Sequence, residues 1–153
     1  MSTVPPGKAG EQIVRDTIRD GLRSTATDDA TTLDDPHAPR GDSQFVLTSY
    51  PDRNVEYPHV IVREVGDTGD RRDSRVDLWL HNYSVRVELL GRSATEAYML
   101  RGGVKAWFQR NHDALRDAGF VDVGLDSSTP MNWESDPGVT ALQVTYSGDL
   151  YTA

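Results

Sequence analysis

Alternation of apolar and polar residues, which is typical of strands, recurs in the first half of the chain. It predicts strands over 44–50 and, more firmly, over His59–Val65, with a turn at Pro51–Asn54 between them. The polar stretch 66–74, GDTGDRRDS, contains two glycines and no apolar residue. We therefore expect it to be a loop.

The longest alternation runs from Val76 to Leu90 and changes phase at His81–Asn82. Such a phase change indicates either a bulge in one strand or a tight turn between two strands. We favour one long bulged strand, which pairs antiparallel with His59–Val65 through the 66–74 loop. Unbroken, it would span about 45–50 Å, which is long enough for a hairpin that projects from the domain.

Two segments have the three- and four-residue apolar spacing of amphipathic helices. One covers Gly10–Ser24, and Gly21 weakens its end. The other begins after Gly91–Arg92, with Ser93 as its N-cap and Glu96 at the matching position of a capping box. The apolar stripe expected on this second helix consists of Ala97, Leu100, Val104, Trp107 and Phe108.

The pair Gly102–Gly103 falls inside the second helix, where each glycine costs on the order of 1 kcal/mol relative to alanine. Close approach of another backbone is the expected compensation. Asn111 begins a short further helix that ends at Gly119, which we predict to be a left-handed cap. Two closing strands are expected over 120–125 and 139–151, with a turn-rich loop over 126–138.

These elements predict an α+β fold. It would be a mainly antiparallel sheet of about four strands with a projecting hairpin, packed against two or three helices. Residues 1–8 are expected to form a flexible tail and residues 9–153 a single domain, because 153 residues most simply make one domain. Residues 24–44 are polar and predict a long loop, of a length that often carries function.

The charged residues are unusual in kind. There are 24 acids, of which 18 are Asp, and 16 bases, of which 14 are Arg and only Lys8 and Lys105 are lysines. An Asp-rich, Lys-poor surface suits high salt, where screening removes the repulsion between excess carboxylates. The alternative is an ordinary acidic bacterial protein. A net charge of −8 argues against broad binding to phosphate backbones.

The chain has no cysteine, which rules out disulfides and thiol chemistry. No apolar run reaches the length of a membrane-spanning helix, and the first residues lack the apolar core of a signal peptide. We therefore expect no membrane association and a protein that is made and used in the cytoplasm.

Catalytic motifs are missing from the sequence. The histidines lie in separate segments without ligand spacing, so no metal or other cofactor is expected. Asp77 and Glu88 faintly resemble the metal-binding acids of restriction-type nucleases. That chemistry needs a lysine two residues after the second acid, where this chain has Leu90. We favour solvent-facing strand positions for both acids. The histidines are His37, His59, His81 and His112.

Five residues are candidates for contacts with a partner. Arg71, Arg72 and Arg75 form the one basic cluster, at the predicted hairpin tip, and either pair with an acidic neighbour, touch nucleic acid or form a solvated loop. Trp79 lies on the opposite face of its strand from the neighbouring leucines and needs cover, for example from a second subunit. Trp133 lies in a polar loop, where it either meets a partner or folds back over the core.

Tyr57–Pro58 precedes the first core strand, a Ser-capped helix carries Ala97 and Leu100, and LRDAGF follows at Leu115–Phe120. In this order and spacing, the chain resembles the tail-terminator (tail-completion or head–tail joining) proteins of tailed viruses. The resemblance covers about residues 10–150 and is firmest over 57–123. The long 24–44 loop and the 126–138 loop depart from the pattern. Together with the composition, the resemblance points to a virus of halophilic archaea.

The resemblance implies a structural virion protein without catalysis or cofactor. Six copies would form a ring through heterologous contacts, cap the completed tail tube and join it to the head connector. The implied partners are other copies of the chain, the major tail tube protein and the head-completion or connector protein. Viral DNA would pass through the lumen without specific binding. Assembly would take place in the host cytoplasm.

Other functions stay open at this point. Stopper and adaptor proteins of the virion neck are also small acidic domains. A small haloarchaeal enzyme with metal-dependent phosphodiesterase chemistry at Asp77 and Glu88 is an alternative from a different class. A general α+β module that binds a ligand or partner is a third.

Overall fold

The computed structural model describes residues 10–23, 46–48, 58–73, 78–131 and 138–152. These residues form one five-stranded sheet of order β1-β2-β3-β5-β4, with three helices. The elements are α1 (Gly10–Arg23), β1 (Val46–Leu47), β2 (His59–Asp73), β3 (Leu78–Gly91), α2 (Ala94–Arg110), α3 (His112–Asp117), β4 (Phe120–Met131) and β5 (Thr140–Thr152). The predicted α+β class is confirmed. The short β1 lies within the strand predicted over 44–50, so the sheet has five strands where about four were expected; β1 pairs parallel with β2, whereas the other pairs are antiparallel.

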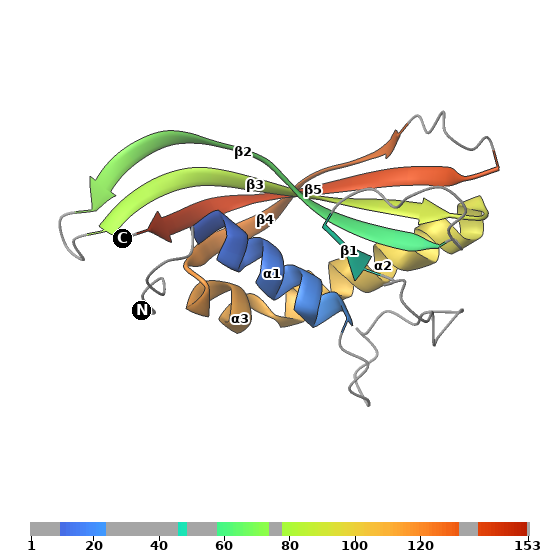
Figure 1. Ribbon diagram of the computed structural model, residues 1–153, viewed down its shortest axis with the longest axis horizontal. Coiled ribbons are helices and arrows are strands. Elements are labelled where there is room, and N and C mark those ends of the chain that lie inside the picture. The colour runs from blue at the N-terminus through green and yellow to red at the C-terminus, as the bar shows by residue number, and fades with distance from the viewer. Residues whose placement is uncertain (1–9, 24–45, 49–57, 74–77, 132–137, 153) are drawn as a thin grey trace.

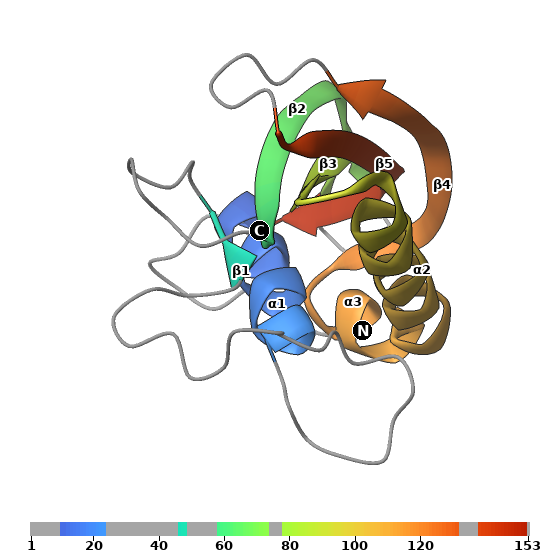
Figure 2. The same cartoon turned by 90° about the vertical axis from the view of Figure 1, so that its right-hand side faces the viewer.

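All three helices lie against the same side of a strongly curved sheet (Figures 1 and 2). We call this side the helix-covered face and the opposite side the helix-free face. The main core lies between the helices and the helix-covered face. From the strands it takes alternate residues, which point to the same side because the side-chain period of a strand is two. In β3 and β5 these are Tyr83, Val85, Val87, Leu89, Leu142, Val144, Tyr146 and Leu150.

The two central strands are regular, and the irregularities lie in the strands beside them. β3 and β5 pair without interruption from Trp79↔Thr152 to Gly91↔Thr140. The predicted bulge at His81–Asn82 is therefore wrong: extra residues occur in β2 instead, between Glu64 and Gly66 and between Thr68 and Arg71. The change of phase arises because β3 buries residues on both faces. Leu80 and Tyr83 are both buried although residues three apart point to opposite sides of a strand.

Two predicted loops belong to strands. Residues 66–73 continue β2 and pair with β3 as far as Asp73↔Leu78, and residues 126–131 continue β4 beside β5. The polar side chains gave no apolar signal there, but long partner strands offer backbone donors and acceptors that any residue except proline can match. Pro130 is accommodated because β4 is an edge strand.

The second predicted helix is confirmed in detail as α2. Ser93 Oγ accepts a hydrogen bond from the Glu96 backbone N–H at 3.2 Å, which caps the first turn. Glu96 reaches back to the backbone N–H of Arg92 at 2.9 Å, one residue before the expected partner. The buried residues of α2 are those of the predicted stripe: Ala97, Leu100, Val104, Trp107 and Phe108.

Three glycines lie in different environments in the fold. Gly21 of α1 is in contact with the Trp107 indole, and a Cβ there would lie 2.3 Å from the ring, so this glycine permits close packing of α1 on α2. Gly119 has a φ of +91°, which confirms the predicted left-handed cap. Among the described residues outside its own helical turns, Gly102 has no atom within 4 Å of an added Cβ, so the close approach expected for the Gly102–Gly103 pair is not found at Gly102.

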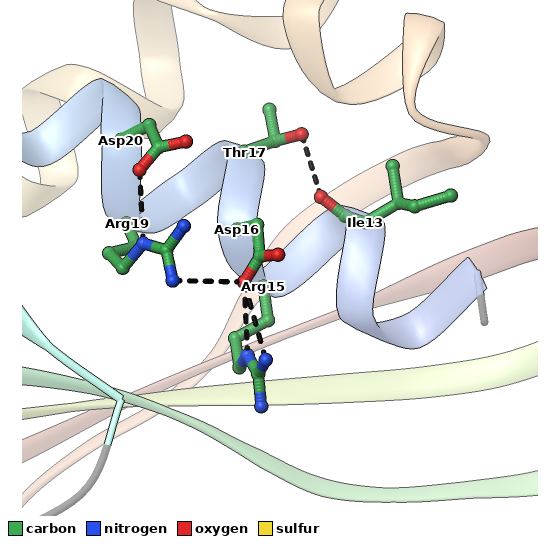
Figure 3. A network of polar contacts seen from close by, with 6 residues as sticks. All are labelled: Ile13, Arg15, Asp16, Thr17, Arg19 and Asp20. Atoms are coloured by element: carbon green, nitrogen blue, oxygen red, sulfur yellow. Dashed lines mark hydrogen bonds and ion pairs between the residues drawn. The ribbon is translucent and has the colours of Figure 1, made fainter. Parts of the chain in front are cut away.

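One flank of α1 carries a row of paired charges, most of them on partly buried side chains (Figure 3). Arg19 contacts Asp16 at 3.2 Å and Asp20 at 3.0 Å, and Arg15 contacts Asp16 at 3.3 Å. The hydrogen bond to Asp20 raises the pKa of Arg19 further above its usual value. Arg15, Asp16, Arg19 and Asp20 thus pair with one another along α1. In the described part of the chain, no helix is both long and apolar enough to cross a membrane.

Candidate functional site

The helix-free face carries polar residues in register across four strands. Residues directly opposite one another in antiparallel strands share a face. In one row Ile61, Glu88, Gln143 and Thr129 are neighbours, and in the next row Arg63, Arg86, Thr145 and Ser127. The sheet register therefore brings an acid and two arginines together from β2 and β3.

Glu88 is the centre of this arrangement and is fully buried. Its Oε1 lies 3.2 Å from Arg86 Nε and 3.7 Å from Arg63 Nη1. Arg86 Nη1 donates to Gln143 Oε1 at 3.2 Å, and Gln143 Nε2 donates to Thr129 Oγ1 at 3.0 Å. We call Arg63, Arg86, Glu88, Gln143 and Thr129 the Glu88 network.

In the Glu88 network one carboxylate contacts two arginine side chains of like charge. Arg63 and Arg86 face each other across β2 and β3, an arrangement that is repulsive by itself. The Glu88 carboxylate between them offsets this repulsion, while the side chains of Arg63 and Arg86 remain 38% and 31% exposed. The expectation that Glu88 faces solvent is therefore wrong. It acts as a buried counter-ion, and the network's outer surface is cationic.

Apolar residues adjoin the network at one end of the helix-free face. Ile61, Leu90 and Ala141 are buried there in a second cluster, with Met131 and Val139 packed against it. Farther along β3, Ser84 Oγ and Ser147 Oγ are 2.9 Å apart and hydrogen bonded. The helix-free face thus changes from apolar to charged to neutral polar along the strands.

A pocket of about 290 Å³ opens on the other side of the sheet, between the α2–α3 junction and β4. Phe108 and Tyr146 form its apolar base, with stacked rings whose centroids are 3.7 Å apart. Burial raises the pKa of the Tyr146 phenol to about 12. The remaining lining residues are Lys105, Gln109, His112, Val123, Gly124 and Leu125.

Bulges in β4 shape this pocket. β4 has extra residues relative to β5 between Val121 and Gly124 and between Leu125 and Ser127. Asp122, inside the first bulge, has a φ of 55°, which is uncommon for a residue with a side chain. Bulges of this kind bend a strand and re-aim its side chains. They leave Leu125 47% exposed at the rim.

Of the five candidate contact residues, the sheet register brings Arg71 and Arg72 beside Trp79 in the backbone of β2 and β3. Arg71 and Arg72 lie in β2, with their backbones opposite Leu80 and Trp79 of β3, and not in a loop. Trp79 is also paired with Thr152, so its backbone lies inside the sheet. Arg75, Trp133 and Asp77 lie outside the described residues, as do the predicted 1–8 tail, the 24–44 loop and the 51–54 turn.

The described histidines are dispersed: His59 is buried at the start of β2, His81 is partly exposed in β3 and His112 is exposed at the start of α3. Within the described ranges, no three His, Cys, Asp or Glu side chains are grouped so that they could hold a metal ion. Arg63, Arg86 and Gln143 are not among the residues predicted from the sequence. For Arg86 a signal exists: it lies two residues before Glu88 in a strand, which places both charges on one face.

Comparison with known proteins yields a likeness of fold. No protein-family model matches the sequence, and no curated protein matches it. Among solved structures, the chain is similar to a chain from the "Virion of native gene transfer agent (GTA) particle". The TM-score is 0.56 at 13% sequence identity, and the match covers 95% of this chain and 99% of that one.

Proposed function

We propose that this protein is a structural component of a virion neck, a tail terminator that forms a ring on the completed tail tube and joins it to the head connector. The observation that carries the proposal is the fold likeness to a chain of a gene transfer agent virion. The likeness extends over 95% of this chain and 99% of the other, so it concerns the whole fold and not one part of it.

The architecture is compatible with assembly into a ring of six copies. Figure 1 shows the far ends of β2 and β3 reaching beyond the helices, where they are available to a neighbouring molecule. Arg71 and Arg72 lie near that end of β2. In the proposal these arginines, with Arg75, Trp79 and Trp133, contribute contacts to other copies, to the tube protein or to the connector.

The charge of the chain fits a conduit for DNA. With a net charge of −8, the lumen of a ring would repel phosphates and let DNA pass without specific binding. The Asp-rich and Lys-poor composition supports a host that lives in high salt, and we propose a virus of halophilic archaea as the source. The ring would be assembled in the host cytoplasm and retained in the virion neck.

The experiment that tests this function is electron microscopy of virus produced with the gene disrupted. A terminator acts by occupying the growing end of the tube, so its loss should leave heads without tails, together with tubes of uncontrolled length. Loss of a stopper or adaptor would leave tubes of normal length. Loss of an enzyme of replication or packaging would leave tails normal and change head filling. Complete and normally joined particles would refute the proposal.

A further inference from the structure

The Glu88 network presents hydrogen-bond donors to solvent and keeps its carboxylate inside. Arginine has N–H donors and no acceptor, so the Gln143 amide oxygen faces Arg86 and the amide nitrogen is left to donate to Thr129. Thr129 Oγ1 accepts that bond and is exposed, so its own hydroxyl proton points to an outside acceptor. Glu88 is fully buried. The outer surface of the network therefore suits a negatively charged group that only accepts hydrogen bonds.

Two arginines share one carboxylate in this network, so one positive charge remains. Arg86 Nε and Arg63 Nη1 lie 3.2 Å and 3.7 Å from the same oxygen, Oε1 of Glu88, and both arginine side chains are partly exposed. Glu88 thus orients both guanidinium groups without cancelling both charges. The two arginines are directly opposite each other on β2 and β3, where side chains start about 5 Å apart. One oxyanion above the sheet can therefore contact both.

A purely structural role would be served better by apolar residues. Like charges directly opposite each other destabilise a sheet, and a buried ionic group is often no more stabilising than well-packed apolar residues of similar volume. The end of the same face shows the apolar solution, because Leu90 and Ala141 are paired and buried there without charges. Departures from the most stable local choice are expected at functional sites.

No exposed acid lies beside the two arginines in the adjacent rows of the described helix-free face. The row of Arg63 and Arg86 continues into two hydroxyl side chains on β5 and β4, and the next row contains the hydrogen-bonded Ser84 and Ser147. The first exposed acid on this face is Asp149, one row farther along. At the usual strand spacings, the band without exposed acids is about 14 Å on each side.

The band matches the phosphate backbone of nucleic acid better than it matches a protein surface. Arginine, serine and threonine are common phosphate-contacting side chains, whereas the centre of a protein interface usually carries aromatic or apolar anchors. In the described part of the chain, the exposed large hydrophobic residues are Tyr98, Met99 and Leu125, on α2 and on the opposite face of β4. The excess acids elsewhere repel phosphates, which confines the contact to this band.

We propose that Arg63 and Arg86, held in place by Glu88, bind backbone phosphates of DNA at the helix-free face. This inference rests on the proposed passage of DNA through a ring, in which the helix-free face would border the lumen. Contacts to phosphates read no sequence. Two cations per copy give a weak contact that salt weakens further, so the DNA is guided and still slides.

The first test observes the arginine side chains of the unaltered protein. Heteronuclear NMR follows the Nε–Hε signals of Arg63 and Arg86 while a short DNA duplex is added, at the lowest salt at which the protein stays folded. We expect both signals to move with added duplex and to move less as KCl is raised. Arg116 on α3 is the internal control, because its side chain is 61% exposed and also paired with an acid. Signals that stay still, or an Arg116 signal that moves equally, would overturn the proposal.

Two other anions separate the possible ligands of the site. Inorganic phosphate and polyglutamate are titrated at the same concentration of negative charge as the duplex. The duplex should saturate the two arginine signals at a charge concentration at least fivefold lower than either. An equal response to polyglutamate would assign the site to an acidic protein, and an equal response to inorganic phosphate would assign it to a free ion. Either result would overturn the proposal.

Removal of single charges is the second test. Arg63→Gln and Arg86→Gln should each weaken duplex binding at least threefold and reduce the slope of log K against log salt by about one. Arg86→Lys, the matched control, keeps the charge and should keep the slope, and Arg116→Gln should leave binding within twofold. Unchanged slopes in the folded Gln variants would contradict the proposal.

These outcomes are separate from the gene-disruption result. Untailed heads in the disrupted stock, together with a protein that does not bind the duplex at this face, would leave the tail role standing and remove only the DNA contact. Complete particles would refute the tail role, whatever the titrations show.

Discussion

The two faces of one sheet are built from alternate residues of the same strands, yet they are stabilised differently. On the helix-covered face Val85, Val87 and Leu89 pack against helices. Between them on β3, Arg86 and Glu88 point to the helix-free face, where Glu88 is as buried as Leu89. Burial by itself therefore says little about how a position is stabilised. One face depends on apolar area and close packing, and the other depends on every charge keeping its partner.

The largest loss of stability should come from a cavity in the core beneath the helix-covered face. Trp107 is buried, lies on Gly21 of α1 and meets Phe108 edge to face with ring centroids 5.2 Å apart. Trp107→Ala removes the contact between two helices and leaves a cavity, so the free energy of unfolding should fall by about 3–5 kcal/mol. Urea denaturation measures this. Gln109→Ala, at an exposed position on the same helix, is the control and should change little.

The second-largest loss of stability should come from removing the acid on the helix-free face. Glu88→Ala leaves Arg63 and Arg86 opposed without a counter-ion. We expect the free energy of unfolding to fall by about 1–3 kcal/mol, less than for fully buried pairs because both arginine side chains are partly exposed. Replacing all three residues by Met, Met and Leu should recover most of that loss. A single Glu88→Ala variant as stable as the parent would show that the network is not needed.

The pH dependence of stability tests the helix-covered face, because the Tyr146 phenol is buried there. Its folded pKa is raised to about 12 from 10.0, so the folded protein holds the phenol proton more tightly than the unfolded chain. The contribution is complete below about pH 10 and is lost as pH rises towards about 12. At about pH 11, the remaining contribution of the Tyr146 proton to the free energy of unfolding is on the order of 1 kcal/mol. Tyr146→Phe should remove this pH dependence, and identical slopes for parent and variant would contradict the assignment.

The smallest effect should come from the neutral end of the helix-free face. Ser84 and Ser147 are both partly exposed and share one hydrogen bond of 2.9 Å. Ser84→Ala should cost about 0.5–1 kcal/mol, and the double change with Ser147→Ala should cost no more than the single one, since no partner is then left over. A double-mutant cycle in urea measures the coupling. Strictly additive losses would show that the two hydroxyls act independently.

Local chemistry made several elements predictable. The Ser93 cap and the stripe from Ala97 to Phe108 depend on residues three or four apart, which a single helix brings together. Gly119 was predictable because its conformation is a property of one residue. The alternation in β3 is likewise a property of one segment, so it correctly indicated a strand, although the bulge was predicted in the wrong strand.

The strands with few apolar residues were not predictable. Residues 66–73 and 126–131 are strands because β3 and β5 continue beside them, and that information lies in another segment of the chain. The bulges of β2 and β4 likewise appear only as differences in length between partners. The Glu88 network depends on the β2–β3–β5 register, and so does the β4 pocket, whose lining comes from segments that are distant in sequence.

By itself, the sequence determined the α+β class, the amphipathic faces of the helices, the acidic and lysine-poor charge, and the lack of cysteine. These are properties of single residues or of neighbours along one element. Only the tertiary structure decided that Glu88 is a buried counter-ion, that Gly21 accommodates Trp107, and that Gly102 faces outward beside Met99. The physical reason is that burial and pairing depend on which strands and helices become neighbours, and that choice is made by the whole core at once.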